Sequence, residues 1–154
     1  MSDIPESMAA ELGAWNNGRG VDLESWVGCE GNFRLAVGYA SLFWPKFEAV
    51  GKYILMKGAT AEKIRGFEAQ AGSTPQSVEA VINHLHIEDI QHLGCEDISA
   101  DKLILLGNML KEIYEAKLFW QFPDRPCTVE FYIPEDAEDL TDYQITFWQK
   151  AFER

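Results

Sequence analysis

The amino-acid sequence predicts an α+β protein in which helices dominate. As far as Pro123, apolar side chains mostly recur every three or four residues, which is the spacing of helices with one buried face. Beyond that point the chain changes to short runs of β-branched and aromatic residues, which favour strands. Hydrophobic residues make up 47% of the chain, and its 5 Trp, 9 Phe and 5 Tyr provide ample apolar surface for a core. The sequence contains neither an internal repeat nor a flexible linker, so we expect one domain over residues 1–154.

The first third of the chain is expected to hold three helices and one strand. Helical spacing predicts a helix over about residues 4–15. Asp22 and Asn32 are good N-cap residues, and they predict a short helix and a stronger one that ends at Pro45. A short apolar run between two glycines then predicts a strand near residues 52–57. The stronger helix carries an apolar face made of Phe33, Ala36, Val37, Ala40, Phe43 and Trp44.

The rest of the chain predicts three more helices and a hairpin. Thr60 and Thr74 are capping residues for two helices. The longest helix begins at Asp97 or Ser99 and extends to Trp120, with a buried face that includes Leu103, Leu106, Leu110 and Ile113. Residues 128–133 and 143–148 predict a β-hairpin with a long acidic loop between them. We expect the strand near 52–57 to join this hairpin in one small antiparallel sheet packed on helices.

The negative charge of the chain is unevenly distributed. The net charge is −12, and residues 78–154 contribute −10 of it, from 16 acidic and 6 basic side chains. Two windows without a base hold most of the acids: Glu68, Glu79, Glu88, Asp89, Glu96, Asp97 and Asp101 in the first, and Glu130, Glu135, Asp136, Glu138, Asp139 and Asp142 in the second. Such a field repels phosphate backbones and anionic lipid and attracts cationic surfaces. The sequence therefore favours a basic protein partner over nucleic acid or a membrane.

The acidic loop and two tryptophans are the candidate partner-binding residues. Electrostatic steering by the loop and anchoring by exposed rings would together account for binding. The plainer interpretation is a solvated loop and a set of core aromatics. The candidate residues are Glu135, Asp136, Glu138, Asp139, Asp142, Trp120 and Trp148.

A cluster of histidines gives an alternative interpretation. If the helix that starts at Thr74 continues, His84, Glu88 and His92 stand four residues apart on one face, with Cys95 nearby. Imidazole and carboxylate are suitable zinc ligands, so these residues are a candidate metal site.

The function that the sequence favours is a non-enzymatic, acidic binding protein that engages a basic protein, in an inhibitor or immunity-type role and without a cofactor. One alternative is a small metal-dependent enzyme or metal-binding protein that uses the histidine cluster. Another is a structural subunit of a homo-oligomer, in which a second copy covers the aromatic surface. The odd number of cysteines and the absence of a signal-peptide pattern lead us to expect a reducing, cytoplasmic location.

Overall fold

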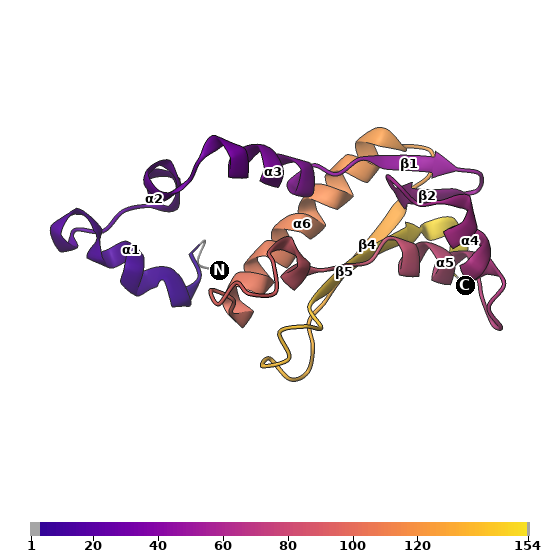
Figure 1. Cartoon of the computed structure of the whole chain (residues 1–154). Coiled ribbons are helices and arrows are strands. Elements are labelled where there is room, and N and C mark those ends of the chain that lie inside the picture. Colours follow the sequence, from indigo (N-terminus) through magenta and orange to yellow (C-terminus); the bar gives the residue numbers. More distant parts are fainter. Residues whose placement is uncertain (1–3, 154) are drawn as a thin grey trace.

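The structure, a computed structural model, describes residues 4–153 of the chain and confirms a helix-dominated α+β fold (Figure 1). The helix that the sequence predicted to be the longest, α6, is the longest, and it crosses the centre of the molecule. No helix among the described residues is long and apolar enough to cross a membrane. The helices are α1 (Glu6–Gly18), α2 (Leu23–Glu30), α3 (Phe33–Phe43), α4 (Ala61–Glu68), α5 (Pro75–Ile82) and α6 (Ala100–Gln121), with 3-10 turns η1 (Ile87–Ile90) and η2 (Lys150–Phe152). The strands are β1 (Phe47–Val50), β2 (Tyr53–Met56), β3 (Leu85–His86), β4 (Cys127–Tyr132) and β5 (Gln144–Gln149).

Side-chain caps begin four of the helices, α2, α3, α4 and α5, at the residues that the sequence predicted. The carboxylate of Asp22 accepts a hydrogen bond from the amide of Ser25 at 2.7 Å, and Asn32 caps α3 in the same way. Thr60 caps α4, and Thr74 forms a reciprocal capping box at the start of α5. These contacts satisfy amide groups that have no partner within the helix. The predicted caps are confirmed because each depends only on residues three apart in the chain.

The strands form two sheets instead of the single sheet expected. β2 pairs with β1, a four-residue strand that the sequence did not predict, while β5 lies between β3 and β4. Two side chains, Glu79 of α5 and Asn83 directly after it, link β2 to β5. Glu79 accepts the amide of Ile54, and the Asn83 amide group donates to the carbonyl oxygens of Ile54 and Phe147. These buried side-chain hydrogen bonds connect β2 to β5, which are not joined by backbone hydrogen bonds as neighbouring strands of one sheet would be.

Most of the buried side chains surround α6. Leu103, Leu110, Tyr114 and Leu118 of this helix pack with aromatic residues of the sheets. The rings of Phe47 and Phe147 meet edge to face, with centroids 4.9 Å apart. A smaller cluster lies between β2, α4 and α5. The body of the molecule, residues 45–153, therefore contains nearly all of the buried apolar surface.

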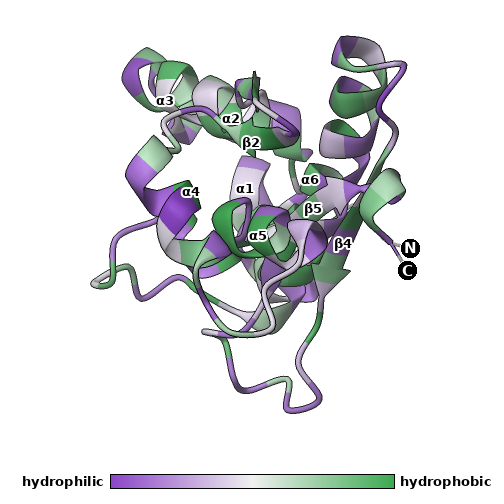
Figure 2. Cartoon of the chain, turned by 90° about the vertical axis from the view of Figure 1, so that its right-hand side faces the viewer, coloured by the Kyte–Doolittle hydropathy of each residue, from purple (hydrophilic) through white to green (hydrophobic). Residues whose placement is uncertain are grey.

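The first three helices form an arm that projects from this body, as Figure 1 shows on its left side. We call residues 6–44 the N-terminal arm. Within the described chain it buries one large apolar side chain, Leu12, and neither α2 nor α3 contains a buried residue. The amide of Ser7 donates to the carboxylate of Asp101 at 2.8 Å, which attaches the arm to the first turn of α6. Of the apolar face predicted for residues 33–44, Phe43 packs against the core and the other five residues are exposed, and α3 appears largely green in Figure 2.

Candidate partner-binding site

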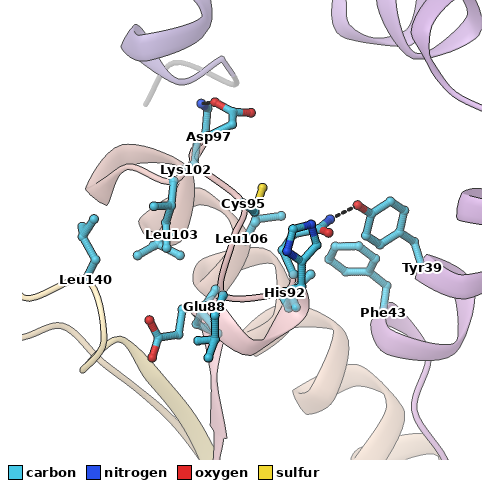
Figure 3. Close-up of a pocket in the computed structure, with 15 residues that line it drawn as sticks. Tyr39, Phe43, Glu88, His92, Cys95, Asp97, Lys102, Leu103, Leu106 and Leu140 are labelled. Carbon is cyan, nitrogen blue, oxygen red and sulfur yellow. Dashed lines mark hydrogen bonds and ion pairs between the residues drawn. The ribbon is translucent and has the colours of Figure 1, made fainter.

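An open hollow of about 470 Å³ lies where the arm meets the body. α3 forms one wall, the segment 87–98 forms the second, and the first half of α6 forms the floor (Figure 3). A volume of this size is within the usual range for ligand and anchor-residue pockets. Its apolar lining consists of Phe43, Ile87, Ile90, Leu93, Ile98, Leu103, Leu106 and Leu140, and its polar lining of Tyr39, Glu88, Gln91, His92, Cys95, Asp97 and Lys102.

Hydrogen bonds hold the second wall in place. The amide of Ile87 donates to the carbonyl oxygen of Tyr143 at 2.8 Å, which fixes η1 beside the C-terminal hairpin. On the other side, the Gln91 side chain donates to the Tyr39 hydroxyl of α3, drawn as a dashed line in Figure 3. At the mouth, Leu93 is 94% exposed. Leu93 therefore extends the apolar lining of the hollow to a position that a partner can reach from solvent.

The rim of the hollow is acidic. Glu88 and Asp97 line it, and their neighbours Asp89 and Glu96 are exposed. Lys102 is the one lysine or arginine among the described lining residues, and its ammonium group is paired with Asp97. Asp97 is thus paired with a lysine, whereas Glu88 has no lysine or arginine beside it among the described lining residues.

The acidic loop 134–142 borders the same hollow. Leu140 belongs to this loop and lines the hollow opposite α3, as Figure 3 shows. The Nδ1 atom of His86 lies 2.8 Å from the carbonyl oxygen of Thr141, which brings the loop against the strand before η1. The structure thus places the two base-free windows of the sequence side by side.

Local hydrogen bonds give the loop a defined shape. Asp136 accepts the amide of Glu138 at 3.0 Å, and Asp139 accepts the hydroxyl of Thr141 at 2.7 Å. Tyr143 donates its hydroxyl to a loop carbonyl, and its pKa is raised, first by burial and then by the loop carboxylates. The predicted partner-binding residues Glu135, Asp136, Glu138 and Asp139 are exposed, and Asp142 is half-buried.

The two predicted tryptophan anchors lie away from this site. Trp120 is 72% exposed near the C-terminal end of α6, at the opposite end of the helix from the hollow-lining residues Lys102 and Leu103 (Figure 1). Trp148 pairs across the hairpin with Thr128, towards the end remote from the loop, and its indole donates to Glu153 at 3.0 Å. The loop and the two rings therefore do not form one surface.

The predicted helical spacing of His84, Glu88 and His92 is absent. α5 ends at Ile82, and the chain continues as β3 and η1, because Ile87 is buried against the hairpin. The Nδ1 atom of His84 instead lies 2.6 Å from the carbonyl oxygen of Val81, and His92 accepts the amide of Gly94. Among residues 4–153 no three metal-ligating side chains come together. The candidate ligands are thus separated by a change of secondary structure.

The cysteines show no feature of a nucleophilic site. Burial, followed by the charge of Glu79, raises the pKa of the Cys127 thiol to about 12, which keeps it protonated. Cys29 is exposed on α2, and Cys95 lines the hollow without a neighbouring base at hydrogen-bonding distance among the described residues.

Sequence reasoning identified the acids of this site but missed its apolar walls. Phe43 and Leu106 were expected on the apolar faces of their helices, Tyr39 was not identified at all, and residues 90–98 show no regular hydrophobic spacing. The available signal was the pair Leu93 and Ile98, two large apolar residues in an acidic, irregular segment where a solvated loop would be polar.

Comparisons of the chain with protein-family models, with curated protein sequences and with solved structures give no match. The function has to be argued from the geometry of the hollow and its charges.

Proposed function

We propose that this protein is a non-enzymatic binding protein that engages a basic protein partner through the hollow and the acidic loop beside it. The observation that carries the proposal is that Leu140 of the acidic loop and Glu88 and Asp97 of the other window line one apolar hollow. An apolar anchor site with carboxylates at its rim and in the adjacent loop matches a partner that presents an apolar side chain among lysines and arginines. An inhibitor or immunity-type role, in which this chain covers the partner's cationic surface, fits that arrangement.

The mechanism has two parts with separate kinetic effects. The unpaired carboxylates attract the partner at long range and speed the encounter. Burial of the partner's apolar residue against Leu93, Leu106 and Leu140 then slows dissociation, because contacts at the centre of an interface control the off-rate. The loop hydrogen bonds through Asp136 and Asp139 keep the charges in position before binding, which reduces the entropy lost in the complex.

The proposal is tested with a synthetic amphipathic helical peptide of lysine and leucine, compared with a glutamate and leucine peptide of the same pattern. We expect the cationic peptide to bind, with an association rate that falls as salt increases, because screening at 0.15 M shortens the Debye length to about 8 Å. The anionic peptide should not bind. Equal binding of the two peptides, or binding of neither, contradicts the proposal.

Two pairs of variants separate the two parts of the mechanism. Glu135→Gln with Glu138→Gln removes two charges without touching the side-chain hydrogen bonds of Asp136 and Asp139, and it should slow association several-fold. Glu62→Gln with Glu112→Gln, two exposed sites elsewhere, is the matched control and should have little effect.

Leu93→Ser should speed dissociation of the cationic peptide by about fivefold or more, because one anchor contact at an interface is commonly worth about 1 kcal/mol. Phe119→Ser, at a ring on α6 that is 74% exposed, should leave dissociation unchanged. Since both side chains are exposed, neither substitution should disturb the core. An unaltered off-rate for Leu93→Ser would exclude the hollow as the anchor site.

A further inference from the structure

α3 exposes an apolar stripe that does not belong to the hollow. Phe33, Val37 and Ala40 lie within about 60° around the axis of α3 for 3.6 residues per turn, and Trp44, the residue that caps the helix, follows them. All four are exposed: Phe33 is 91% accessible, Val37 73% and Trp44 53%. Trp44 keeps this exposure although the Lys117 ammonium group lies 4.5 Å from its ring centroid. The stripe is a contiguous apolar face along the whole of α3.

The charge of the chain limits what can cover this face. Residues 31–47 form the longest segment of the sequence without an acidic residue, and Arg34 and Lys46 are its charged members. A cationic partner would gain nothing electrostatically here, in contrast to the rim of the hollow. For a second copy of this chain, which also carries −12, an acid-free segment is the place where two such molecules can approach closely.

The order of residues along the stripe allows the stripes of two copies to pack against each other. In an antiparallel pair centred between Gly38 and Tyr39, Phe33 of one copy faces Trp44 of the other, and Val37 faces Ala40. Large rings therefore meet at both ends, and the small side chains in the middle allow the helices to approach. This is the self-complementarity that a two-fold symmetric interface requires.

The Arg34 side chains of the two copies are separated by nine residues along the paired helices, or about 13 Å at 1.5 Å per residue. That distance exceeds the screening length of about 8 Å at physiological salt.

We propose that a second copy of this chain docks on the Phe33–Trp44 stripe, so that two α3 helices pair antiparallel across a two-fold axis. This interface is separate from the acidic hollow, so each copy in the dimer keeps its proposed partner-binding site. α3 has 11 residues, and a contact of this length is small for a protein interface. We therefore expect a reversible dimer that forms in a concentration-dependent manner.

Sedimentation velocity of the whole chain over a range of concentrations tests the pairing. We expect a shift from monomer to dimer that strengthens as salt rises, because salt screens the repulsion between two copies of charge −12. Binding of a cationic peptide weakens as salt rises, whereas dimerisation strengthens. Because the two proposals predict opposite effects of salt, each can fail without the other. A chain that remains monomeric at all concentrations in high salt overturns the dimer.

Substitution locates the interface. Val37→Glu places two carboxylates in the centre of the paired stripe, and it should raise the concentration for half-dimerisation by about tenfold or more, since burying an unpaired charge is costly. Phe119→Glu adds the same charge at another exposed apolar site and is the control. Circular dichroism checks that both variants fold, which we expect because neither side chain is buried. A dimer that tolerates Val37→Glu overturns the proposed surface.

Disulfide trapping checks the register in a Cys29→Ser background, which removes the exposed native thiol. A mixture of the Val37→Cys and Ala40→Cys chains should form a cross-linked heterodimer within minutes under mild oxidation. Each of these chains alone should cross-link far more slowly, because the antiparallel register separates equivalent positions. Faster cross-linking of either chain alone than of the mixture overturns the antiparallel register.

Discussion

Gly107 of α6 lies directly beneath the ring of Phe131 on β4. A Cβ atom at position 107 would be 2.1 Å from the Cζ atom of Phe131, far inside van der Waals contact. The absence of a side chain here lets the central helix pack closely against the hairpin, next to Leu103 and Leu110 in the core.

Gly107→Ala should therefore destabilise the protein despite the better helix propensity of alanine. We expect a loss of about 1–3 kcal/mol, as for other overpacked core positions, measured by urea unfolding followed by circular dichroism. Gly66→Ala is the matched control, since Gly66 is also helical and nothing lies within 4 Å of its added Cβ. That variant should gain about 0.5–1 kcal/mol. A neutral Gly107→Ala variant would mean that α6 and β4 are less closely packed than described.

Glu79 is fully buried and joins strands of the two sheets. It accepts backbone amides from Ile54 and Gln149, each at 2.7 Å. Burial raises its pKa, and these hydrogen bonds oppose that shift. Glu79→Gln preserves shape but replaces one acceptor oxygen with a donor that faces an amide. We expect a loss of about 1–3 kcal/mol in free energy of unfolding, the cost of a buried unsatisfied group. Glu62→Gln, at an exposed site, should leave stability unchanged.

The attachment of the arm should depend on the charge of Asp101. Hydrogen bonds, first from the Ser7 amide and then from the Ser99 side chain, lower the pKa of Asp101 from 3.8 to about 2. Because the folded pKa is depressed, the stabilisation is complete above pH 3.8 and is lost as pH falls through about 2. At neutral pH, Asp101→Asn should raise the hydrogen-exchange rates of α1 amides and leave those of α6 unchanged. Asp124→Asn, at an exposed site outside the arm contact, is the control. Equal protection of α1 in both variants would show that other contacts hold the arm.

Tyr114 has a buried hydroxyl without a hydrogen-bond partner among residues 4–153. Burial raises its pKa from 10.0 to about 12, so titration of this hydroxyl does not affect stability below pH 10, and it lowers stability as pH rises from 10 through 12. Tyr114→Phe removes the unpaired group and keeps the ring that meets Phe47 edge to face. We expect unfolding free energy at neutral pH to stay the same or rise by about 1 kcal/mol, measured by urea unfolding. A clear loss of stability would reveal a partner for the hydroxyl.

The sequence predicted those parts of the fold that depend on near neighbours. The caps at Asp22, Asn32 and Thr74 and the central helix from Ser99 involve residues a few positions apart, so local pattern was sufficient. The strand β1 was missed because its four residues include Glu48 and show no clear alternation. The condition for the metal site, that α5 continues towards His92, is not met because Ile87 is buried and hydrogen-bonded to Tyr143, and these are long-range effects.

The candidate site was only partly predictable for the same reason. The acidic windows were predictable because the charged residues are read directly from the sequence. The hollow between them is built from α3, residues 87–98, α6 and Leu140, four segments that are far apart in the chain. The sequence correctly identified which residues of α3 share an apolar face. Helical spacing does not, however, show what covers that face. Whether the same chain or another molecule covers that side is decided by tertiary arrangement.

The arm also determines what an optical experiment on this protein can detect. Trp15, Trp26 and Trp44 belong to the arm, Trp120 and Trp148 to the surface of the body, and all five, which lie within residues 4–153, are at least partly accessible to solvent. The aromatic side chains of the core are instead phenylalanine and tyrosine. Intrinsic tryptophan emission will therefore respond to movement of the arm and to any molecule that covers it, with Trp148 of β5 adding a response to melting of the body, which the far-ultraviolet circular dichroism reports directly. In this protein, a fluorescence transition that precedes the dichroism transition is the signature of a detached arm on a body that is still folded.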